Sequence, residues 1–589
     1  MSNFYLDNQD LVFRLEHAGL QRVVRLREDD YTQAHDFTFA PADYEDALDS
    51  FRRALEIAGD IAGEFVAPRA EDVDRAGSEL SCGEVCYAPG ISESLERLRQ
   101  ADLMGITLPR RFGGLNFPVS ITVMVIEMVS RADPALMNIF GLQDISDTVN
   151  KFATEELKAE LLPRFSSGQI TGSMALTEAE AGSDLQSVQL KATLESDGVW
   201  RLNGVKRFIT NGCGQISLVL ARSEEGTTDA RGLSLFAYER DEHMKIRRLE
   251  DKLGIHGSPT CELQFTDAPA RLVGERRRGL TTYVMSLMNG ARLAIAAQAQ
   301  GIAEAAFRAA AKYADERVQF GRPISRLTAV AAMLADMKVS ILASRALLYE
   351  TSLIVDTKDA LEHAILAAAE ATQAPGSSET RREPALSPEE VRRLRTELKR
   401  YTRLAALYTP LCKACSTEMA NRVTYDSLQV HGGSGYMRDF AVERHARDAR
   451  ITNIYEGTTQ LQVVAAIGGV LGGSLADRLE EYDAWDLAST PELLDRLRSA
   501  RAKLEQAIAA IKETGDERFR DYHARRLVEM GTDVICGYLL LRDAQDDAQR
   551  LLAARHFIEG ACARVAGGVQ HIAAGRAEDL DDLSALGRV

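Results

Sequence analysis

The spacing of apolar residues changes twice along the 589-residue chain, and this order restricts the fold more than any other feature. Over residues 44–164 apolar positions recur at three and four, as in Leu55, Ala58 and Ile61, which is typical of amphipathic helices. From residue 171 the pattern is that of short strands, and from residue 281 helical patterns return. We therefore expect an α+β chain in the order helices, sheet, helices.

Closely spaced turn signals interrupt the strand-forming region. Residues 187–202 alternate, with a turn at Asp197-Gly198, and Asn203-Gly204 follows as a second turn signal. Further short strands are expected over residues 216–221, 233–238 and 261–265. A run of short strands with close turns predicts an antiparallel sheet or a small barrel.

Loops and glycine pairs divide the helical region that follows the sheet. Residues 291–317 are rich in Ala and predict a long helix, and residues 373–389 predict an exposed loop between two helices. After the glycine pairs at 468–469 and 472–473, an amphipathic, highly charged helical block runs to the end. The predicted divisions are an N-terminal extension without a strong period (1–45), an N-terminal α-helical domain (46–170), a middle β-domain (171–280), a C-terminal α-helical bundle domain (281–470) and a C-terminal helical extension (471–589).

Charge and hydropathy exclude several classes of function. The formal net charge of −17 argues against a nucleic-acid binder, because a phosphate backbone requires a basic surface. The N-terminus has no secretory signal pattern. The uncharged run at 457–476 is too polar for a membrane span, so we interpret it as a buried helix followed by a glycine hinge. Membrane association is not indicated, and a cytoplasmic location is expected.

The eight cysteines are scattered, which is typical of reduced thiols. Only Cys412-x-x-Cys415 has a spacing that suggests a metal or redox site. It lies in a helical pattern without a second Cys or His pair nearby, so the favoured interpretation is a helix core and no metal is expected.

Four further motifs stand out in the sequence, and each alone is typical of an ordinary turn or loop. They are residues 174–184 (MALTEAEAGSD), 206–212 (KRFITNG), 317–323 (RVQFGRP), and the pair 429–435 (QVHGGSG) and 454–460 (IYEGTTQ). In this order and at these separations they closely resemble the acyl-CoA dehydrogenase family. The resemblance covers roughly residues 46–470, and the length of the chain is similar to very-long-chain and methylthiopropionyl-CoA dehydrogenase members.

The resemblance implies that Glu456 is the catalytic base. A thioester α-proton is very weakly acidic, so its removal requires a desolvated carboxylate and preorganised donors for the enolate oxygen. In the family these donors are the backbone N–H of this Glu and a ribityl hydroxyl of FAD. Some relatives carry the base just before the Arg of the long helix, where this chain has Ala291. The alternative for Glu456 is an ordinary surface or helix-capping residue.

The resemblance also implies contacts with FAD and with the acyl-CoA substrate. Phe208 matches an aromatic residue that covers the flavin, although an ordinary core residue of a strand is the alternative. The implied cofactor-binding residues are Met174, Leu176, Thr177, Gly182, Ser183, Phe208, Thr210, Arg317, Gln319, Phe320, Gln429, Gly432, Gly433, Thr458 and Gln460. The implied substrate-binding residues are Ser183, Asn289, Arg292, Tyr455 and Gly457.

Two arginines of the long helix imply an oligomer. Arg292 matches a substrate-side residue and Arg317 a cofactor-side residue, yet 25 helical residues span roughly 37 Å. One helix cannot bring both to one small site. We therefore expect Arg317 and its neighbours to reach the FAD of another subunit, and a homodimer is favoured over a tetramer because an extra helical block replaces a second dimer in some long relatives.

The implied reaction is FAD-dependent α,β-dehydrogenation of an acyl-CoA thioester to the trans-2-enoyl-CoA, as in fatty acid β-oxidation and acyl-CoA degradation, with electrons passed to electron-transfer flavoprotein. An acyl-CoA oxidase that uses dioxygen is the alternative enzyme, and the terminal residues LGRV, which are no peroxisomal signal, argue against it. A catalytically silent acyl-CoA-binding subunit is the alternative from another class. It predicts loss of the base, whereas Glu456 is present.

Overall fold

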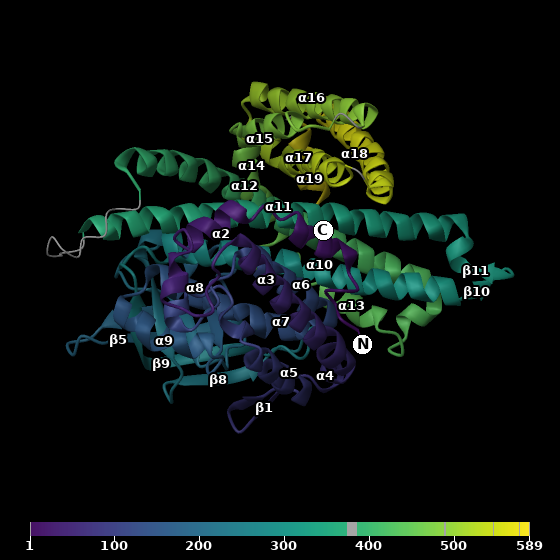
Figure 1. Cartoon of the computed structure of the whole chain (residues 1–589). Coiled ribbons are helices and arrows are strands. Elements are labelled where there is room, and N and C mark those ends of the chain that lie inside the picture. Colours follow the sequence, from purple (N-terminus) through teal and green to yellow (C-terminus); the bar gives the residue numbers. More distant parts are fainter. Residues whose placement is uncertain (1, 374–385, 488–489, 546, 577, 588–589) are drawn as a thin grey trace. The chain divides into compact units, whose positions relative to one another are not determined.

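The computed structural model describes residues 2–373, 386–487, 490–545, 547–576 and 578–587 (Figure 1). The chain forms two compact units. Unit 1 consists of Met1–Ala306 and Gly432–Glu456, and unit 2 of Phe307–His431 and Gly457–Val589.

The N-terminal segment of unit 1 differs from the prediction of an extension without a strong period. It folds into α1 (Gln9–Glu16) and α2 (Gln21–Arg27), which bury Leu11, Leu15, Val23 and Val24. Glu28 after α2 accepts a hydrogen bond from Arg110 Nη2 at 3.0 Å, with both side chains buried. The sequence pattern does not predict these two helices, because charged residues surround their few apolar ones. Their burial also depends on contacts with residues about 80 positions away along the chain.

The remaining helices of the first part of unit 1 lie where the helical pattern predicts them. They are α3 (Tyr44–Asp60), α4 (Ala70–Ala76), α5 (Pro89–Gln100), α6 (Val119–Ala132), α7 (Pro134–Phe140), α8 (Ile145–Phe152) and α9 (Glu155–Ser166). Asp133 begins α7, since its side chain accepts from the N–H of Ala135 at 2.8 Å and Pro134 occupies the first helical position. A small unpredicted hairpin, β1 (Glu79–Ser81) and β2 (Glu84–Cys86), lies between α4 and α5.

Seven strands form the sheet of unit 1. They are β3 (Gly172–Ala175), β4 (Lys191–Leu194), β5 (Trp200–Thr210), β6 (Ile216–Arg222), β7 (Leu233–Glu239), β8 (Met244–Leu249) and β9 (Thr260–Val273). Their order is β3-β6-β4-β5-β9-β7, β8 pairs with β9, and the pairing of β6 with β7 closes the path into a ring. Most pairs are antiparallel, as predicted, but β3 runs parallel to β6.

The predicted turn at Asn203-Gly204 is wrong, because both residues lie inside β5. The register against β9 shifts between Leu202 and Gly204. Gly204 has φ +145°, and a Cβ there would lie 3.0 Å from Leu190 Cα. A bulge with close backbone approach requires glycine just as a turn does, so the dipeptide alone does not separate the two structures.

The long helices follow the sheet. The predicted helix over 291–317 is α10 (Met285–Glu316), and α13 (Val442–Ala449) adds a later piece to unit 1. In unit 2, α12 (Pro388–His431) packs against both α11 (Thr328–Gln373) and α14 (Thr459–Leu471). The predicted loop between α11 and α12 falls largely on residues 374–385, which lie outside the described residues.

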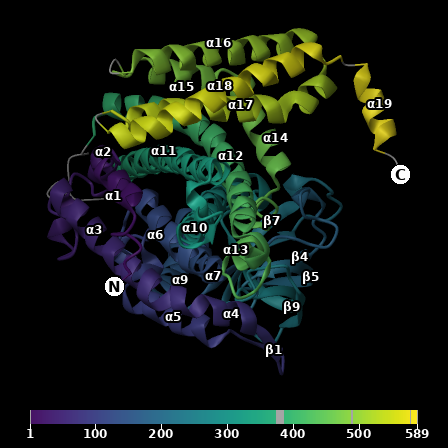
Figure 2. The same cartoon turned by 90° about the vertical axis from the view of Figure 1, so that its right-hand side faces the viewer.

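The C-terminal block belongs to unit 2. It contains α15 (Ser474–Asp483), α16 (Pro491–Thr514), α17 (Glu517–Asp543), α18 (Ala548–Ala574) and α19 (Asp579–Leu586), with α16, α17 and α18 side by side (Figure 2). Buried Glu350 of α11 accepts from Arg542 Nη1 at 2.8 Å and from the Tyr482 hydroxyl at 3.0 Å. These charge-assisted hydrogen bonds attach the block to the bundle helix.

The glycine hinge predicted within 457–476 is confirmed, whereas the helix before it is only partly buried, with Val464 61% exposed. Helices α14 and α15 bend by 69° around Gly472 and Gly473, and Gly473 has φ +98°. Among the described residues, no single helix has the length and apolar character to cross a membrane, although α14 and α15 pass that test together by length and composition.

Candidate functional site

Glu456 is the last residue of unit 1 and stands in a strained conformation. Its φ is +53°, in the left-handed region that residues other than glycine rarely occupy. The turn before it is held by the N–H of Tyr455, which donates to Ile451 O at 3.1 Å. A left-handed residue costs about 1–3 kcal/mol and persists only where its surroundings fix it, a situation common at active sites. The side chain is partly buried, so the surface or capping alternative is not favoured.

Arg292 on α10 supplies a buried positive charge to the surroundings of Glu456. Burial lowers the pKa of Arg292, while the negative charge of Glu456 acts in the opposite direction. Its Nη1 donates to Asn289 Oδ1 at 3.2 Å, and its buried Nε makes no hydrogen bond with the described residues. Three residues predicted from sequence, Glu456, Arg292 and Asn289, therefore share one region of unit 1.

The hydroxyl of Tyr455 is hydrogen-bonded inside unit 1. It donates to Gln298 Oε1 and lies 3.1 Å from Asn138 Oδ1. Burial, followed by the charge of Glu456, raises the pKa of Tyr455 far above its usual range. The predicted substrate-side residue is thus anchored through its polar end, and only its ring remains for other contacts.

A second group of predicted residues lies around the end of β3. Met174 belongs to β3, and Leu176 and Thr177 follow it. The N–H of Arg207 in β5 donates to Thr177 O at 2.9 Å, which brings the motif at 174–184 beside the motif at 206–212.

Phe208 is half exposed, with φ +61°, in a second bulge of β5 between Lys206 and Ile209. An ordinary core residue of a strand has neither property, so the core interpretation is wrong. The guanidinium of Arg207 lies 4.6 Å from the Phe208 ring centroid. Thr210, at the end of the same strand, is partly buried.

The exposed loop after Thr177 contains Gly182 and Ser183. A Cβ at Gly182 would meet no heavy atom within 4 Å, so no protein contact requires glycine there. The same holds for Gly433, and for Gly432, which also has φ +61°. Open glycines leave the backbone accessible to a group from outside the chain.

The motif at 317–323 forms a hairpin in unit 2. Strands β10 (Val318–Gln319) and β11 (Arg322–Pro323) are joined by Phe320 and Gly321, with φ +52° and +77°. Positive φ at both central residues defines a type I′ turn. Arg317, Gln319 and Phe320 are exposed, and Phe320 is 90% exposed.

The hairpin of unit 2 lies near the end of α12. The N–H of Arg317 donates to Tyr313 O at 2.8 Å, and the Tyr313 ring stacks on His431 with centroids 4.3 Å apart. Exposed Gln429 lies two residues before His431 on α12. Unit 2 thus brings Arg317 and Gln429 into one neighbourhood.

The residues after Glu456 begin unit 2. The carbonyl of Gly457 accepts from Lys413 Nζ at 2.7 Å and from Gln462 Nε2 at 2.9 Å. The Thr458 hydroxyl caps α14 by accepting from the N–H of Leu461, and Gln460 is exposed.

Several residues of these neighbourhoods had no predicted role. Asn138 and Gln298 carry no sequence signal, because their partners lie more than 150 residues away. Lys413 lies in the middle of a helical pattern, so the sequence gives no signal for its role either. Lys206 lies within the motif 206–212, outside the strands predicted from sequence, and the structure places it in β5.

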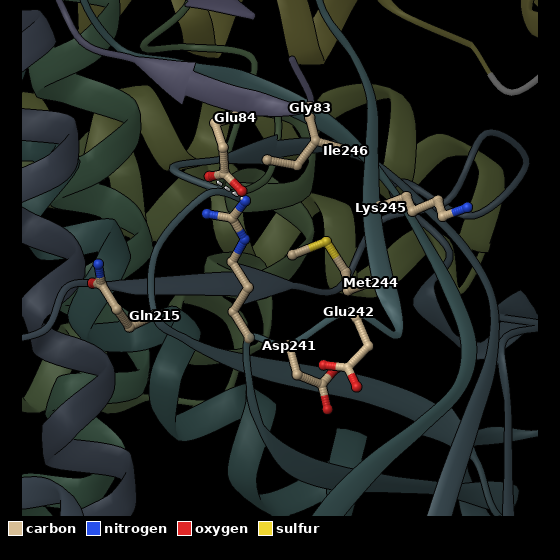
Figure 3. A pocket seen from close by; sticks show the side chains of 9 residues that line it. Gly83, Glu84, Gln215, Asp241, Glu242, Met244, Lys245 and Ile246 are labelled. Atoms are coloured by element: carbon tan, nitrogen blue, oxygen red, sulfur yellow. Dashed lines mark hydrogen bonds and ion pairs between the residues drawn. The ribbon is translucent and has the colours of Figure 1, made fainter. Parts of the chain in front are cut away.

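A separate hollow of about 660 Å³ lies at the first hairpin and the sheet (Figure 3). Glu84 pairs with Arg240 there at 2.6 Å, and Asp241, Glu242 and Lys245 add further charges. None of the sequence-predicted site residues lines it. No cluster of three or more His, Cys, Asp or Glu suited to a metal ion occurs among the described residues.

The residues of unit 1 fit a flavin. A half-exposed aromatic ring, the hydroxyls of Thr177 and Thr210, and a glycine whose Cβ position is open supply a stacking surface, hydrogen-bonding groups and access. The buried Nε of Arg292 has no hydrogen-bond acceptor among the described residues, so a polar group near Glu456 is left without a protein partner.

The sequence matches four family models. These are the acyl-CoA dehydrogenase N-terminal domain (residues 50–169), middle domain (173–268), C-terminal domain (278–373 and 396–467), and a further model named acyl-CoA dehydrogenase C terminal (472–580). Together these models extend from the helices of unit 1 through the C-terminal block.

Individual proteins agree with the family models. The chain is 30% identical to 3-methylmercaptopropionyl-CoA dehydrogenase from Ruegeria pomeroyi over 534 residues, covering 85% of this chain and 82% of that protein. Butyryl-CoA dehydrogenase from Megasphaera elsdenii superposes with a TM-score of 0.58 at 28% identity, covering 72% and 98%. An acyl-CoA dehydrogenase from Bacillus anthracis, complexed with FAD, shares the fold with a TM-score of 0.73 at 22% identity, covering 91% and 90%. The chain therefore belongs to the acyl-CoA dehydrogenase family, whose cofactor is FAD and whose members are oxidoreductases.

Proposed function

We propose that the chain catalyses the α,β-dehydrogenation of an acyl-CoA thioester to its trans-2-enoyl-CoA, with Glu456 as the base that removes the α-proton. The observation that carries this proposal is the conformation of Glu456, a partly buried carboxylate with φ +53° in the electrostatic environment of buried Arg292. Some relatives carry the base at a different position, and this chain has Ala291 there, which cannot remove a proton.

The protein's contribution to the reaction is orientation and charge. The Glu456 side chain is partly buried, and the bound substrate is proposed to exclude the remaining water from its carboxylate. The backbone N–H of Glu456 is proposed to donate to the thioester oxygen, where negative charge develops as the α-proton leaves. Arg292 balances the charge of the carboxylate. Bound FAD would supply the acceptor for the β-hydrogen, which would leave as a hydride.

Two sets of residues are proposed to hold FAD. Met174, Leu176, Thr177, Phe208 and Thr210 are proposed to contact the flavin ring. This assignment is supported by the hydrogen bond between Arg207 N and Thr177 O and by the exposed Phe208 ring. Gly182 and Ser183 are proposed to let the cofactor and CoA approach the backbone. Arg317, Gln319, Phe320, Gln429, Gly432 and Gly433, with Thr458 and Gln460, complete the proposed set.

A homodimer with shared flavin sites is proposed on the basis of the hairpin. Its tip residue Phe320 is 90% exposed, and Arg317 at its base is exposed as well. Val318 of the same hairpin is 54% exposed, so the hairpin presents two large apolar side chains that a partner surface is proposed to cover. A guanidinium binds two phosphate oxygens through its planar fork, which suits the FAD pyrophosphate of the neighbouring subunit.

Electron-transfer flavoprotein is the proposed acceptor of the electrons.

The acyl-CoA is proposed to bind with its thioester between Glu456 and the flavin. The residues proposed to lie near it are Asn289, Arg292, Tyr455 and Gly457, with Tyr455 contributing its ring.

The test is the visible spectrum of the purified protein, followed by anaerobic titration with acyl-CoA thioesters of different chain length and branching. We expect flavin bands that bleach with one class of thioester. Fast reoxidation of the bleached flavin by dioxygen would assign an oxidase instead of a dehydrogenase. A flavin that no thioester bleaches would contradict the proposed reaction.

A further inference from the structure

A network of three polar side chains lies directly before the proposed base. Tyr455 of the turn, Asn138 of α7 and Gln298 of α10 meet in the interior of unit 1. Gln298 is fully buried and Asn138 is 5% exposed. These residues come from three separate segments of unit 1, so they connect the turn before Glu456 to two helices.

Hydrogen bonds fix the orientation of the Gln298 amide. Its Nε2 donates to Pro134 O at 3.0 Å and to Asn138 Oδ1 at 2.8 Å. Its Oε1 therefore faces the Tyr455 hydroxyl and accepts from it. Asn138 Oδ1, 3.1 Å from that hydroxyl, is the second polar neighbour. The position of the hydroxyl is thus set chiefly by the Gln298 amide, whose own orientation is fixed by the carbonyl of Pro134.

Helix α10 contributes to both sides of Glu456. Gln298 anchors the residue before the base, and Arg292, six residues earlier on the same helix, supplies the buried charge that acts on the base. Six helical residues correspond to about 9 Å along the axis. A rotation or shift of α10 would change the anchor and the charge together.

The conformation of Glu456 explains why such an anchor is needed. A residue at φ +53° relaxes toward a common region of backbone space unless its neighbours prevent it. Packing alone does not fix the direction of the Tyr455 ring, whereas its hydroxyl must point at Gln298 Oε1 to donate its single proton. Losing the hydroxyl leaves the ring in place and removes the directional restraint.

We infer that Tyr455, Gln298 and Asn138 are positioning residues that hold the Glu456 carboxylate in line with the substrate α-carbon. This inference rests on the proposed function, since it requires that Glu456 removes a proton. The Tyr455 hydroxyl then acts through the backbone of its neighbour and does not touch the reacting atoms. The α7 helix, begun by Asp133, becomes part of the support of the base.

The experiment compares Tyr455→Phe, Gln298→Met and the double variant with the wild type, and uses Tyr425→Phe on exposed Tyr425 as the matched control. Flavin bleaching is followed anaerobically with the saturated acyl-CoA that reduces the wild type fastest, in its ordinary form and with deuterium at both α positions. Each single variant is expected to bleach about 10–100-fold more slowly, with FAD content unchanged and apparent substrate affinity altered by less than about threefold.

The isotope effect separates positioning from general loosening of the fold. A misplaced base slows proton removal specifically, so the α-deuterium effect on bleaching should increase in both single variants. The double variant should be no slower than the worse single variant, because both changes remove the same restraint. Should Tyr455→Phe fail to fold, Gln298→Met, which keeps the side-chain volume, provides the same comparison.

Two failures are distinguishable. Wild-type bleaching rates and isotope effects in folded Tyr455→Phe or Gln298→Met, in an enzyme whose wild type does bleach, would overturn this inference alone. A wild-type flavin that no thioester bleaches would overturn the proposed function and this inference with it.

Discussion

Lys206 of β5 is completely buried, and its Nζ donates to Glu178 Oε1 at 2.9 Å. The same ammonium donates to Leu176 O at 2.8 Å, while Glu178 accepts from the N–H groups of Gln189 and Leu190 at 2.8 and 2.9 Å. Burial lowers the pKa of Lys206 to about 8, and Glu178 opposes this shift. The ion pair therefore fixes both sides of the loop that contains Thr177.

Replacing Lys206 should loosen that loop. In Lys206→Met the Glu178 carboxylate loses its cation and Leu176 O loses its donor, so we expect a loss of about 3–5 kcal/mol in unfolding free energy. FAD retention on gel filtration should fall as well. Lys191→Met, at an exposed lysine of β4, is the control and should change neither quantity. Normal stability and FAD content in Lys206→Met would refute the role of the pair.

Removing the proposed base should abolish turnover and leave the cofactor in place. We expect Glu456→Gln to retain FAD, because the substitution is nearly isosteric, and to lose several orders of magnitude in bleaching rate, as is typical for an essential base. The control is Glu492→Gln at an exposed position of α16. Wild-type-like bleaching in Glu456→Gln would remove this residue from the mechanism.

The hairpin of unit 2 should matter for FAD and for assembly. Arg317→Ala is expected to weaken FAD retention several-fold, since a bidentate contact with phosphate is lost, without changing the fold of the hairpin. Light scattering coupled to gel filtration measures the subunit count in parallel, and two subunits are expected. Arg326→Ala serves as the control, because Arg326 is also exposed and lies outside the hairpin. Unchanged FAD content in Arg317→Ala would count against shared flavin sites.

A buried acid on α13 should make stability depend on pH. Burial raises the pKa of Asp448 to about 7, the N–H of Ile255 at 2.6 Å and the charge of Arg444 oppose this, and Asp74 and Asp133 raise it further. The pKa of Asp133 is itself raised to about 6, chiefly by burial.

Because the folded-state pKa of Asp448 exceeds its unfolded value of 3.8, folding stability is highest below about pH 4 for this group and is lost as the pH rises toward 7. In Asp448→Asn the acceptor for Ile255 N remains and the charge is gone. The fall in unfolding free energy of unit 1 between pH 5 and 7 should therefore become smaller, by about 1–3 kcal/mol. Denaturant unfolding at several pH values measures this, with Asp495→Asn at an exposed position as control. Identical pH slopes in wild type and Asp448→Asn would show that Asp448 is ionised without penalty.

Local pattern predicted most elements, and its errors have a common cause. The switch from helical to strand spacing located the sheet, and the paired glycines located the bend between α14 and α15. The dipeptide Asn203-Gly204 was misinterpreted because a bulge inside β5 needs glycine for the same steric reason as a turn. The helices of the first 45 residues were missed because their burial depends on distant partners such as Arg110.

By itself, the sequence determined the order of the helical and strand regions, the family resemblance and Glu456 as the candidate base, because backbone preferences and short motifs act over a few residues. Tertiary structure decided which side chains support that candidate and which support the loop that contains Thr177. Asn138 and Gln298 reach Tyr455 from 317 and 157 positions away, and Lys206 reaches Glu178 across 28. Such hydrogen bonds exist only after packing has excluded water from both partners, so no local pattern records them.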